Sequence, residues 1–107
     1  MRSLLLSLPV LLVTAAPVLA DDPVVRISIK DHQFEPAEVA VPAGIKVRLL
    51  VKNERQVNAE FESNSLHREK IVNPGSEVMV FVGPLDPGSY DIFDDFNRET
   101  RGRIIVK

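Results

Sequence analysis

The stretch VMVFVGPLDPGSYDIF, residues 78–93, decides the class of fold. Val78–Val82 form an unbroken apolar run of strand length, Tyr90–Phe93 form a second run, and Pro84 and Pro87-Gly88 stand between them. Pro and Gly end strands and form turns, because Pro lacks a backbone N–H and Gly tolerates backbone angles that other residues avoid. The pattern predicts two strands joined by a turn, with the first strand buried on both faces.

The same alternation of short apolar runs and turn signals extends in both directions from this stretch. Further strand-sized runs occupy residues 24–29, 39–41, 45–51, 59–61, 71–72 and 103–106. No apolar pattern with a period of 3.6 residues is long enough for a helix, apart from a single turn around Ser63–Arg68. So many short strands in so short a chain predict an all-β fold, a small antiparallel sandwich or barrel.

The first 20 residues, MRSLLLSLPVLLVTAAPVLA, have the composition of a secretory signal peptide. A positively charged start precedes an apolar stretch, and Val18-Leu19-Ala20 fits the small-residue rule for cleavage. The apolar stretch is interrupted by Ser7, Pro9 and Thr14 and is shorter than a membrane span of about 20 residues. We therefore expect residues 1–20 to be removed, residues 21–107 to form one domain, and the mature protein to be periplasmic and not membrane-spanning.

Composition excludes several classes of function. The 107 residues contain no Cys and no Trp, with 13 Lys and Arg against 15 Asp and Glu. Without Cys there is no disulfide, thiolate zinc site, iron–sulfur cluster or type 1 copper centre. A near-neutral charge offers no basic footprint for nucleic acid. The motifs of Ser hydrolases, zinc proteases and phosphate-binding loops are also absent, so the sequence favours a protein that is not an enzyme.

Three stretches resemble the cupredoxin family. They are DHQFEP (31–36) with VPAG (41–44), NPG (73–75), and GSYDIF (88–93) continuing through GRIIV (102–106). The order and spacing of these motifs are similar to those of the small cupredoxin-like proteins that accompany bacterial high-affinity iron uptake. The resemblance covers nearly the whole mature chain. It implies a Greek-key β-sandwich and, as partners, periplasmic or membrane components of an iron permease system.

The resemblance also assigns candidate metal positions. Counted from Tyr90, the Cys, His and Met ligands of copper-binding cupredoxins fall on Asp94, Asn97 and Thr100 of this chain. The other His ligand of the family lies a few residues after the third core strand, and the Glu that the iron-associated members carry in its place matches Glu60. The copper ligands are thus replaced, and a site would depend on Glu60 and Asp94, with Asp95 and Glu62 nearby. A ferroxidase role follows only by resemblance.

Carboxylates define the chemistry of such a site. Their oxygens are hard ligands that suit iron, manganese, calcium or magnesium better than Cu(I). Carboxylates buried together also have raised pKa values, because like charges resist joint ionisation. The resident ion would be copper or iron, and the alternative is a solvated acidic loop without an ion.

The two histidines are weaker candidates. His32 lies beside Asp31 and could join a metal site, or could be a residue of a surface turn. His67 lies among charges of both signs and could be a ligand or an exposed loop residue. Met79, in an apolar run, is expected to pack in the core, as are most of the five Phe residues. Phe96 could instead be an exposed docking residue.

Two functions from different classes remain. The first is a metal-binding or redox accessory protein of iron transport, in which Glu60 and Asp94 bind iron or copper with help from His32, Asp95 or His67. The second is a metal-free cupredoxin-fold interaction module whose acidic loops bind a partner protein. A third, an immunoglobulin-like adhesion module, shares the sandwich but fits the 31–36 and 90–102 segments less well.

Overall fold

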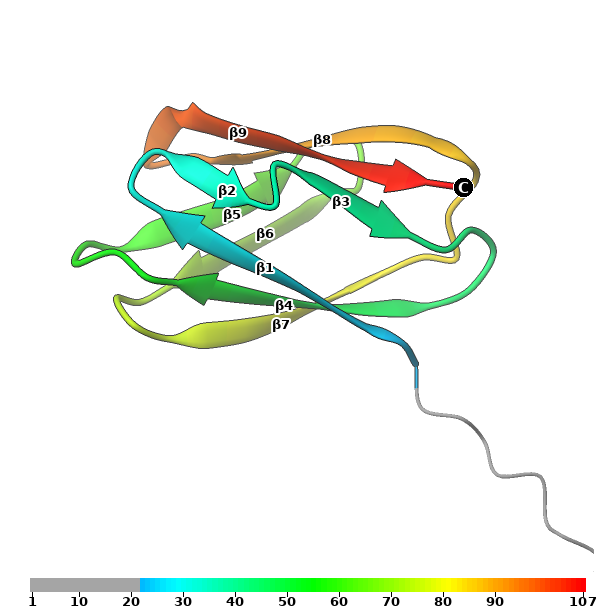
Figure 1. The fold of residues 1–107 in the computed structure, drawn as a ribbon, viewed down its shortest axis with the longest axis horizontal. Helices are drawn as coiled ribbons and strands as arrows, with labels where there is room; N and C mark the ends of the chain where they lie inside the picture. The colour runs from blue at the N-terminus through cyan, green and yellow to red at the C-terminus, as the bar shows by residue number, and fades with distance from the viewer. Residues whose placement is uncertain (1–21) are drawn as a thin grey trace, which may run out of the picture.

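A computed structural model describes residues 22–107, which fold into two β-sheets packed face to face (Figure 1). The predicted signal peptide, 1–20, lies outside the described residues. No helix among residues 22–107 is long and apolar enough to cross a membrane. The strands are β1 (Val24–Lys30), β2 (Gln33–Glu35), β3 (Glu38–Val41), β4 (Val47–Asn53), β5 (Ala59–Ser63), β6 (Arg68–Val72), β7 (Glu77–Val82), β8 (Gly88–Asp94) and β9 (Asn97–Val106).

The chain crosses between the two sheets several times. One sheet has the order β2-β1-β4-β7 and the other the order β3-β9-β8-β5-β6. Most neighbours are antiparallel, but β1 runs parallel to β4 and β3 runs parallel to β9. Parallel neighbours need a crossover connection, so the first strands and the last strand are tied to distant parts of the chain. The predicted all-β sandwich is confirmed.

The core lies between the sheets and follows the alternation of the strands. On β4 the inward residues Val47, Leu49 and Val51 are fully buried. Phe34 of β2 packs edge to face against Phe61 of β5, with ring centroids 6.3 Å apart, and so joins the two sheets. Edge-to-face pairs align the positive ring edge with the negative ring face, which adds to the free energy of burial.

The interpretation of Val78–Val82 as a strand buried on both faces is wrong. β7 lies at the end of its sheet, and its side chains alternate between the core and solvent. Met79 is 39% exposed and Phe81 is 43% exposed, so Met79 is not a core residue. A short apolar run has the same appearance in a central strand and in an edge strand, and its position in the sheet is not encoded locally.

Two other expectations need correction. The segment around Ser63–Arg68 contains no helical turn. It is a turn between β5 and β6, in which His67 adopts a φ of +54°. Of the five phenylalanines, Phe34, Phe61 and Phe93 are buried as expected, whereas Phe81 and Phe96 are exposed. The sequence also gave no indication of β2, which is only three residues long.

Candidate metal centre

Three carboxylates converge on the outer face of the five-stranded sheet, where the end of β8 lies beside β5. Glu60 and Glu62 alternate with the buried Phe61 on β5, so both project from the outer face of the sheet. Asp95 follows β8, and its backbone N–H donates to the Glu60 carbonyl over 2.9 Å. One carboxylate oxygen from each of the three lies within 4.8 Å of the other two. An ion held by oxygen at about 2.0–2.6 Å spans ligand atoms separated by roughly 3–5 Å, so little movement would close the site.

The cluster contains more negative than positive charge. Glu60 is only 8% exposed, and no Lys, Arg or His of the described chain lies within ion-pair distance of its carboxylate. Burial raises the pKa of the Glu60 carboxyl, and the negative charges of Glu69, Asp95 and Glu62 raise it further. A bound cation would remove this repulsion, because it favours the ionised form of every carboxylate that it contacts.

Glu62 shares this environment. Burial raises the pKa of the Glu62 carboxyl, and the charges of Asp95 and Glu69 raise it further. Arg98 opposes the shift. Arg98 contacts Asp95 directly, with Nη2 2.8 Å from Oδ1, and is the one cation paired within the cluster among the described residues. Three carboxylates therefore face one guanidinium, which leaves an excess of negative charge for an ion.

Asp94 lies behind the cluster. Its side chain is fully buried and points to the inner face of the sheet, on the same side as Phe61. One oxygen, Oδ1, accepts hydrogen bonds from the Glu60 and Phe96 backbone N–H groups over 2.9 and 3.0 Å. The other, Oδ2, accepts from Arg55 Nη1 over 2.7 Å. Asp94 thus holds in place the backbone of Glu60 and of the turn that carries Asp95.

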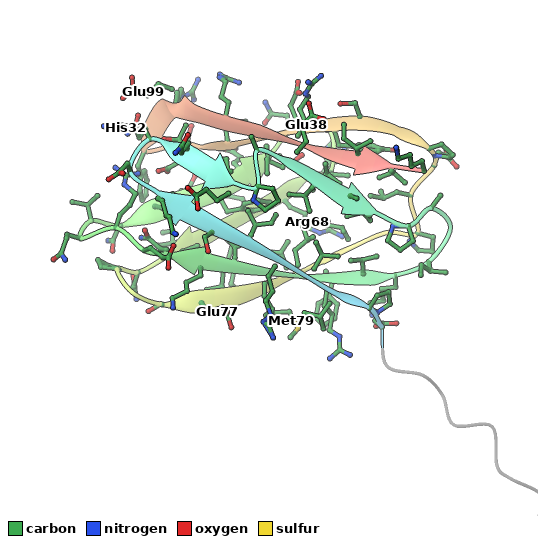
Figure 2. The ribbon with its side chains drawn as sticks, viewed as in Figure 1. His32, Glu38, Arg68, Glu77, Met79 and Glu99 are labelled. Atoms are coloured by element: carbon green, nitrogen blue, oxygen red, sulfur yellow. The ribbon has the colours of Figure 1, made fainter. Side chains whose placement is uncertain are left out.

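The histidines lie outside this cluster. His32 is in the turn between β1 and β2, and Figure 2 shows it beside Glu99. Its Nδ1 is 2.6 Å from Asn97 Nδ2 and 3.2 Å from Glu99 Oε1, so it links the hairpin to β9. His67 lines an open groove of about 290 Å³ that also contains Glu62 and Glu69.

The positions of the copper ligands form no soft-metal site. Asp94 is bonded to Arg55, Asn97 contacts His32, and Thr100 is fully buried. The Thr100 hydroxyl has no hydrogen-bond partner among the residues that the structure describes. Carboxylate, amide and hydroxyl oxygens do not provide the thiolate and thioether ligands that bind Cu(I). The chemistry available here is the binding of a hard cation by Glu60, Glu62 and Asp95.

The sequence predicted a site on Glu60 and Asp94 with Asp95 and Glu62 nearby, and did not rank Glu62 among the ligands. The structure brings Glu60, Glu62 and Asp95 together and leaves Asp94 behind them. The available signal was the alternation Glu60-Phe61-Glu62, which places two carboxylates on one face once Phe61 is taken as core. Glu69 was missed because its approach to Glu62 depends on the register of β5 against β6.

A comparison with known protein families agrees with the observed sandwich fold and with the sequence motifs. A family model described as a cupredoxin-like domain matches residues 3–106. The chain belongs to the cupredoxin-like domain family. The 31–36, 73–75 and 88–106 motifs that carried the resemblance all lie within the matched range, so this recognition is confirmed.

Curated relatives are longer than this chain. An uncharacterised protein of Rickettsia prowazekii is 49% identical over 83 residues, which cover 77% of this chain and 66% of that protein. The iron uptake system component EfeO of Yersinia pseudotuberculosis is 31% identical over 110 residues, covering 99% of this chain and 28% of its own length. EfeO of Escherichia coli K12 is 32% identical, with 82% of this chain and 24% of that protein covered. The cupredoxin-like unit thus corresponds to about a quarter of EfeO.

Solved structures support the fold. The metal-binding domain of the Streptococcus pneumoniae Cu(I)-exporting ATPase CopA superposes with a TM-score of 0.71 at 15% identity, covering 78% of this chain and 84% of that one. Amicyanin from Paracoccus versutus superposes with a TM-score of 0.60 at 24% identity, covering 87% and 88%. At these identities the likeness establishes the shared sandwich and nothing about the metal.

Proposed function

We propose that this protein is a periplasmic metal-binding accessory protein of iron transport, and that it holds a hard cation on Glu60, Glu62 and Asp95. The observation that carries the proposal is the Glu60 carboxylate, which is 8% exposed, faces two other carboxylates and lacks a paired cation in the described chain. Burying such a charge is unfavourable unless a partner neutralises it.

The choice of iron over copper rests on two separate arguments. All-oxygen ligand sets favour hard ions, and Fe(II) or Fe(III) fits them better than Cu(I). The relatives named as an iron uptake system component supply the physiological context. In the proposed role the protein binds the ion outside the cytoplasm and transfers it to a periplasmic or membrane component of an iron permease system. Asp94 acts as a positioning residue, and His67, which lines the groove that contains Glu62, is an imidazole that could join the site.

A metal-free interaction module is the competing function. The Arg98–Asp95 ion pair favours it, because a guanidinium already neutralises part of the cluster. The exposed Phe96, next to Asp95, would then form part of the contact with a partner protein. The two functions differ in one measurable property, the affinity of the isolated protein for an ion.

Calorimetric titration of the protein beginning at Asp21 tests the proposal. Fe(II) under anaerobic conditions, Cu(II) and Cu(I) would each be titrated into the wild type, Glu60→Gln and Glu62→Gln. Glu77→Gln is the matched control, because Glu77 is an exposed carboxylate on the other sheet. We expect micromolar or tighter binding of Fe(II), at least tenfold weaker in both site variants and unchanged in the control. No binding of any ion, or binding that is unaffected by both site variants, would overturn the proposal.

A further inference from the structure

The outer face of the four-stranded sheet carries an apolar patch with a basic border. The register of β1, β4 and β7 aligns Val24 with Arg48 and Phe81, and Arg26 with Leu50 and Met79. Arg48 lies between Val24 and Phe81 in the first of these rows. Cross-strand neighbours on one face have Cβ atoms about 5 Å apart, so Leu50 adjoins Met79, and Phe81 follows Met79 on the same face of β7. They form a patch on which Met79 and Phe81 are exposed and Leu50 is half-buried.

Positive charge surrounds this patch and is not neutralised by the described chain. The cations of the border are Arg26, Lys46, Arg48, Lys52 and Arg68. None of them lies within 4.0 Å of a described Asp or Glu carboxylate, whereas Lys30, Arg55, Arg98 and Arg103 are all paired. Lys46 lies over the Phe81 ring, 4.7 Å from its centroid, and Arg68 donates to backbone carbonyls only. A third row aligns Ser28 with Lys52 and Glu77, and Glu77 is the sole acidic residue in the three rows.

The edge of β7 borders the same patch. In an antiparallel pair the backbone groups of alternate residues face the partner strand, and the others face away. The Arg48 N–H bonds Pro23 on the β1 side, and the Phe81 carbonyl accepts from the Arg68 guanidinium outside the sheet. Phe81, Met79 and Glu77 therefore direct their backbone groups toward the open edge. Figure 2 shows Glu77 and Met79 along this edge strand.

We propose that this surface, defined by Arg26, Arg48, Leu50, Met79 and Phe81, binds an acidic extended segment of a partner protein that adds to β7 as a further strand. An exposed sheet edge provides backbone hydrogen bonds, and the side chains beside it provide selectivity. A strand added there places every second side chain on the outer face, next to Met79 and Phe81 and within reach of the basic border. Five cations without carboxylate partners select for Glu and Asp at those positions.

The site is separate from the proposed metal centre. The carboxylate cluster lies on the outer face of the five-stranded sheet, whereas this surface lies on the other sheet of the sandwich. One molecule therefore presents an acidic face and a basic, apolar face at the same time. Loss of metal binding would leave the docking surface unchanged, so failure of one proposal is distinguishable from failure of the other.

A designed peptide tests the proposal directly. The probe is a blocked peptide of nine residues in which Glu alternates with Val, titrated into ¹⁵N-labelled protein at 20 mM salt. We expect chemical-shift changes at Leu50, Met79 and Phe81 and slower hydrogen exchange of the Met79 amide, because that N–H gains a carbonyl partner. Arg48→Glu should weaken binding at least tenfold. Lys107→Glu, an exposed cation beyond the end of β9, should leave it unchanged. A peptide with Lys in place of Glu should not bind.

Several results would overturn the proposal. Shifts without protection of the Met79 amide would show that the patch binds without strand addition. Absence of shifts at this face would show that it is not a docking surface for acidic segments. Two further measurements test other occupants of the surface. Sedimentation of the protein alone detects self-association, and flotation with vesicles containing 30% phosphatidylglycerol detects lipid binding. Self-association that Arg48→Glu abolishes would assign the surface to a second copy of the chain, and vesicle binding without peptide binding would assign it to a lipid surface.

Discussion

Asp94 occupies the position at which copper-binding cupredoxins carry their Cys ligand. In this protein its carboxylate stabilises the folded structure. It bonds Arg55 and the backbone N–H groups of Glu60 and Phe96 in a fully buried environment. Removing one member of a buried ion pair leaves the other charge without a partner, which typically costs about 3–5 kcal/mol. We expect Asp94→Asn to lower the free energy of unfolding by about 3 kcal/mol in urea denaturation.

Asp95→Asn is the matched control for this prediction. Asp95 is the next residue, and its ion pair is with Arg98, whose side chain is 71% exposed. Exposed pairs contribute about 0–1 kcal/mol, so the control should unfold at nearly the same urea concentration as the wild type. Equal stability of Asp94→Asn and Asp95→Asn would refute the structural role of Asp94.

Glu60 makes the stability of the metal-free protein depend on pH. Its folded pKa is raised above the ordinary value of 4.5, so the folded state binds more protons than the unfolded state between the two values. The contribution of Glu60 to stability is therefore present below pH 4.5 and is lost as the pH rises through the folded pKa. We expect Glu60→Gln to be more stable than the wild type at pH 7 in chelator, and the difference to shrink toward pH 4.5. Urea denaturation across this range measures it, and a difference that is constant with pH would contradict the pKa shift.

The Thr100 hydroxyl is a buried donor that has no partner within residues 22–107. Valine has nearly the same shape and no polar group, so the substitution removes a desolvation penalty of about 1–3 kcal/mol and leaves the packing intact. We predict that Thr100→Val raises the free energy of unfolding by roughly 1 kcal/mol. Thr100→Ser, which keeps the hydroxyl and removes a methyl group, should lower it. A Val variant that is less stable than the wild type would indicate that the hydroxyl has a partner in solution.

At the scale of elements, the connection from β7 to β8 depends on Gly83. Its φ is +94°, and a Cβ built there would lie 2.5 Å from the Ile45 carbonyl oxygen. Gly44 also has a positive φ, +76°, but a Cβ there would meet nothing within 4 Å. A Cβ at Gly44 would therefore introduce backbone strain alone, which costs about 1–2 kcal/mol, whereas a Cβ at Gly83 would introduce the same strain and a steric clash.

We expect Gly44→Ala to lower the free energy of unfolding by about 1 kcal/mol and Gly83→Ala to lower it clearly more. Calorimetric melting of both variants measures the difference. Equal losses would mean that the backbone at Ile45 moves away from a new Cβ at little cost, and that the connection is not tightly packed.

The composition of a strand does not show whether it lies at the edge or at the centre of a sheet, although this position decides how exposed its side chains are. β4 and β7 both read as apolar runs, yet β4 has a neighbour on each side whereas β7 has only one. The outer face of β4 is therefore partly covered by cross-strand side chains, and that of β7 is open at Met79 and Phe81. This difference creates the surface proposed to bind an acidic segment.

At the scale of the whole molecule, ion binding should couple to folding. A ligand that binds only the folded state at 100 times its Kd stabilises that state by about 2.7 kcal/mol. In a domain of 60–100 residues, 1 kcal/mol corresponds to a shift in Tm of about 4–8 °C. We expect saturating Fe(II) under anaerobic conditions to raise the Tm of the wild type by about 10 °C or more. Glu62→Gln should show less than half of this increase, and an equal increase in both proteins would place the ion elsewhere.

Local sequence patterns were sufficient to predict most of the fold. Alternating apolar residues predicted the principal strands, and Pro-Gly pairs predicted their ends, because both depend on backbone geometry within a few residues. The resemblance, counted from Tyr90, pointed to Asp94, Asn97 and Thr100, which lie outside the carboxylate cluster, and the absence of Cys excluded type 1 copper. The signal peptide over residues 1–20 stays a prediction.

Contacts between distant residues decided the rest. Asp94 and Asp95 are adjacent and identical in the sequence, yet one faces the core beside Arg55 and the other joins Glu60 and Glu62 outside. Which face each carboxylate takes depends on the bulge between β8 and β9 and on the pairing of β5 with β8. The open edge at β7 likewise depends on the order of strands in the sheet. Local pattern determined which residues form strands, and only the tertiary packing determined which strands, and which carboxylates, meet.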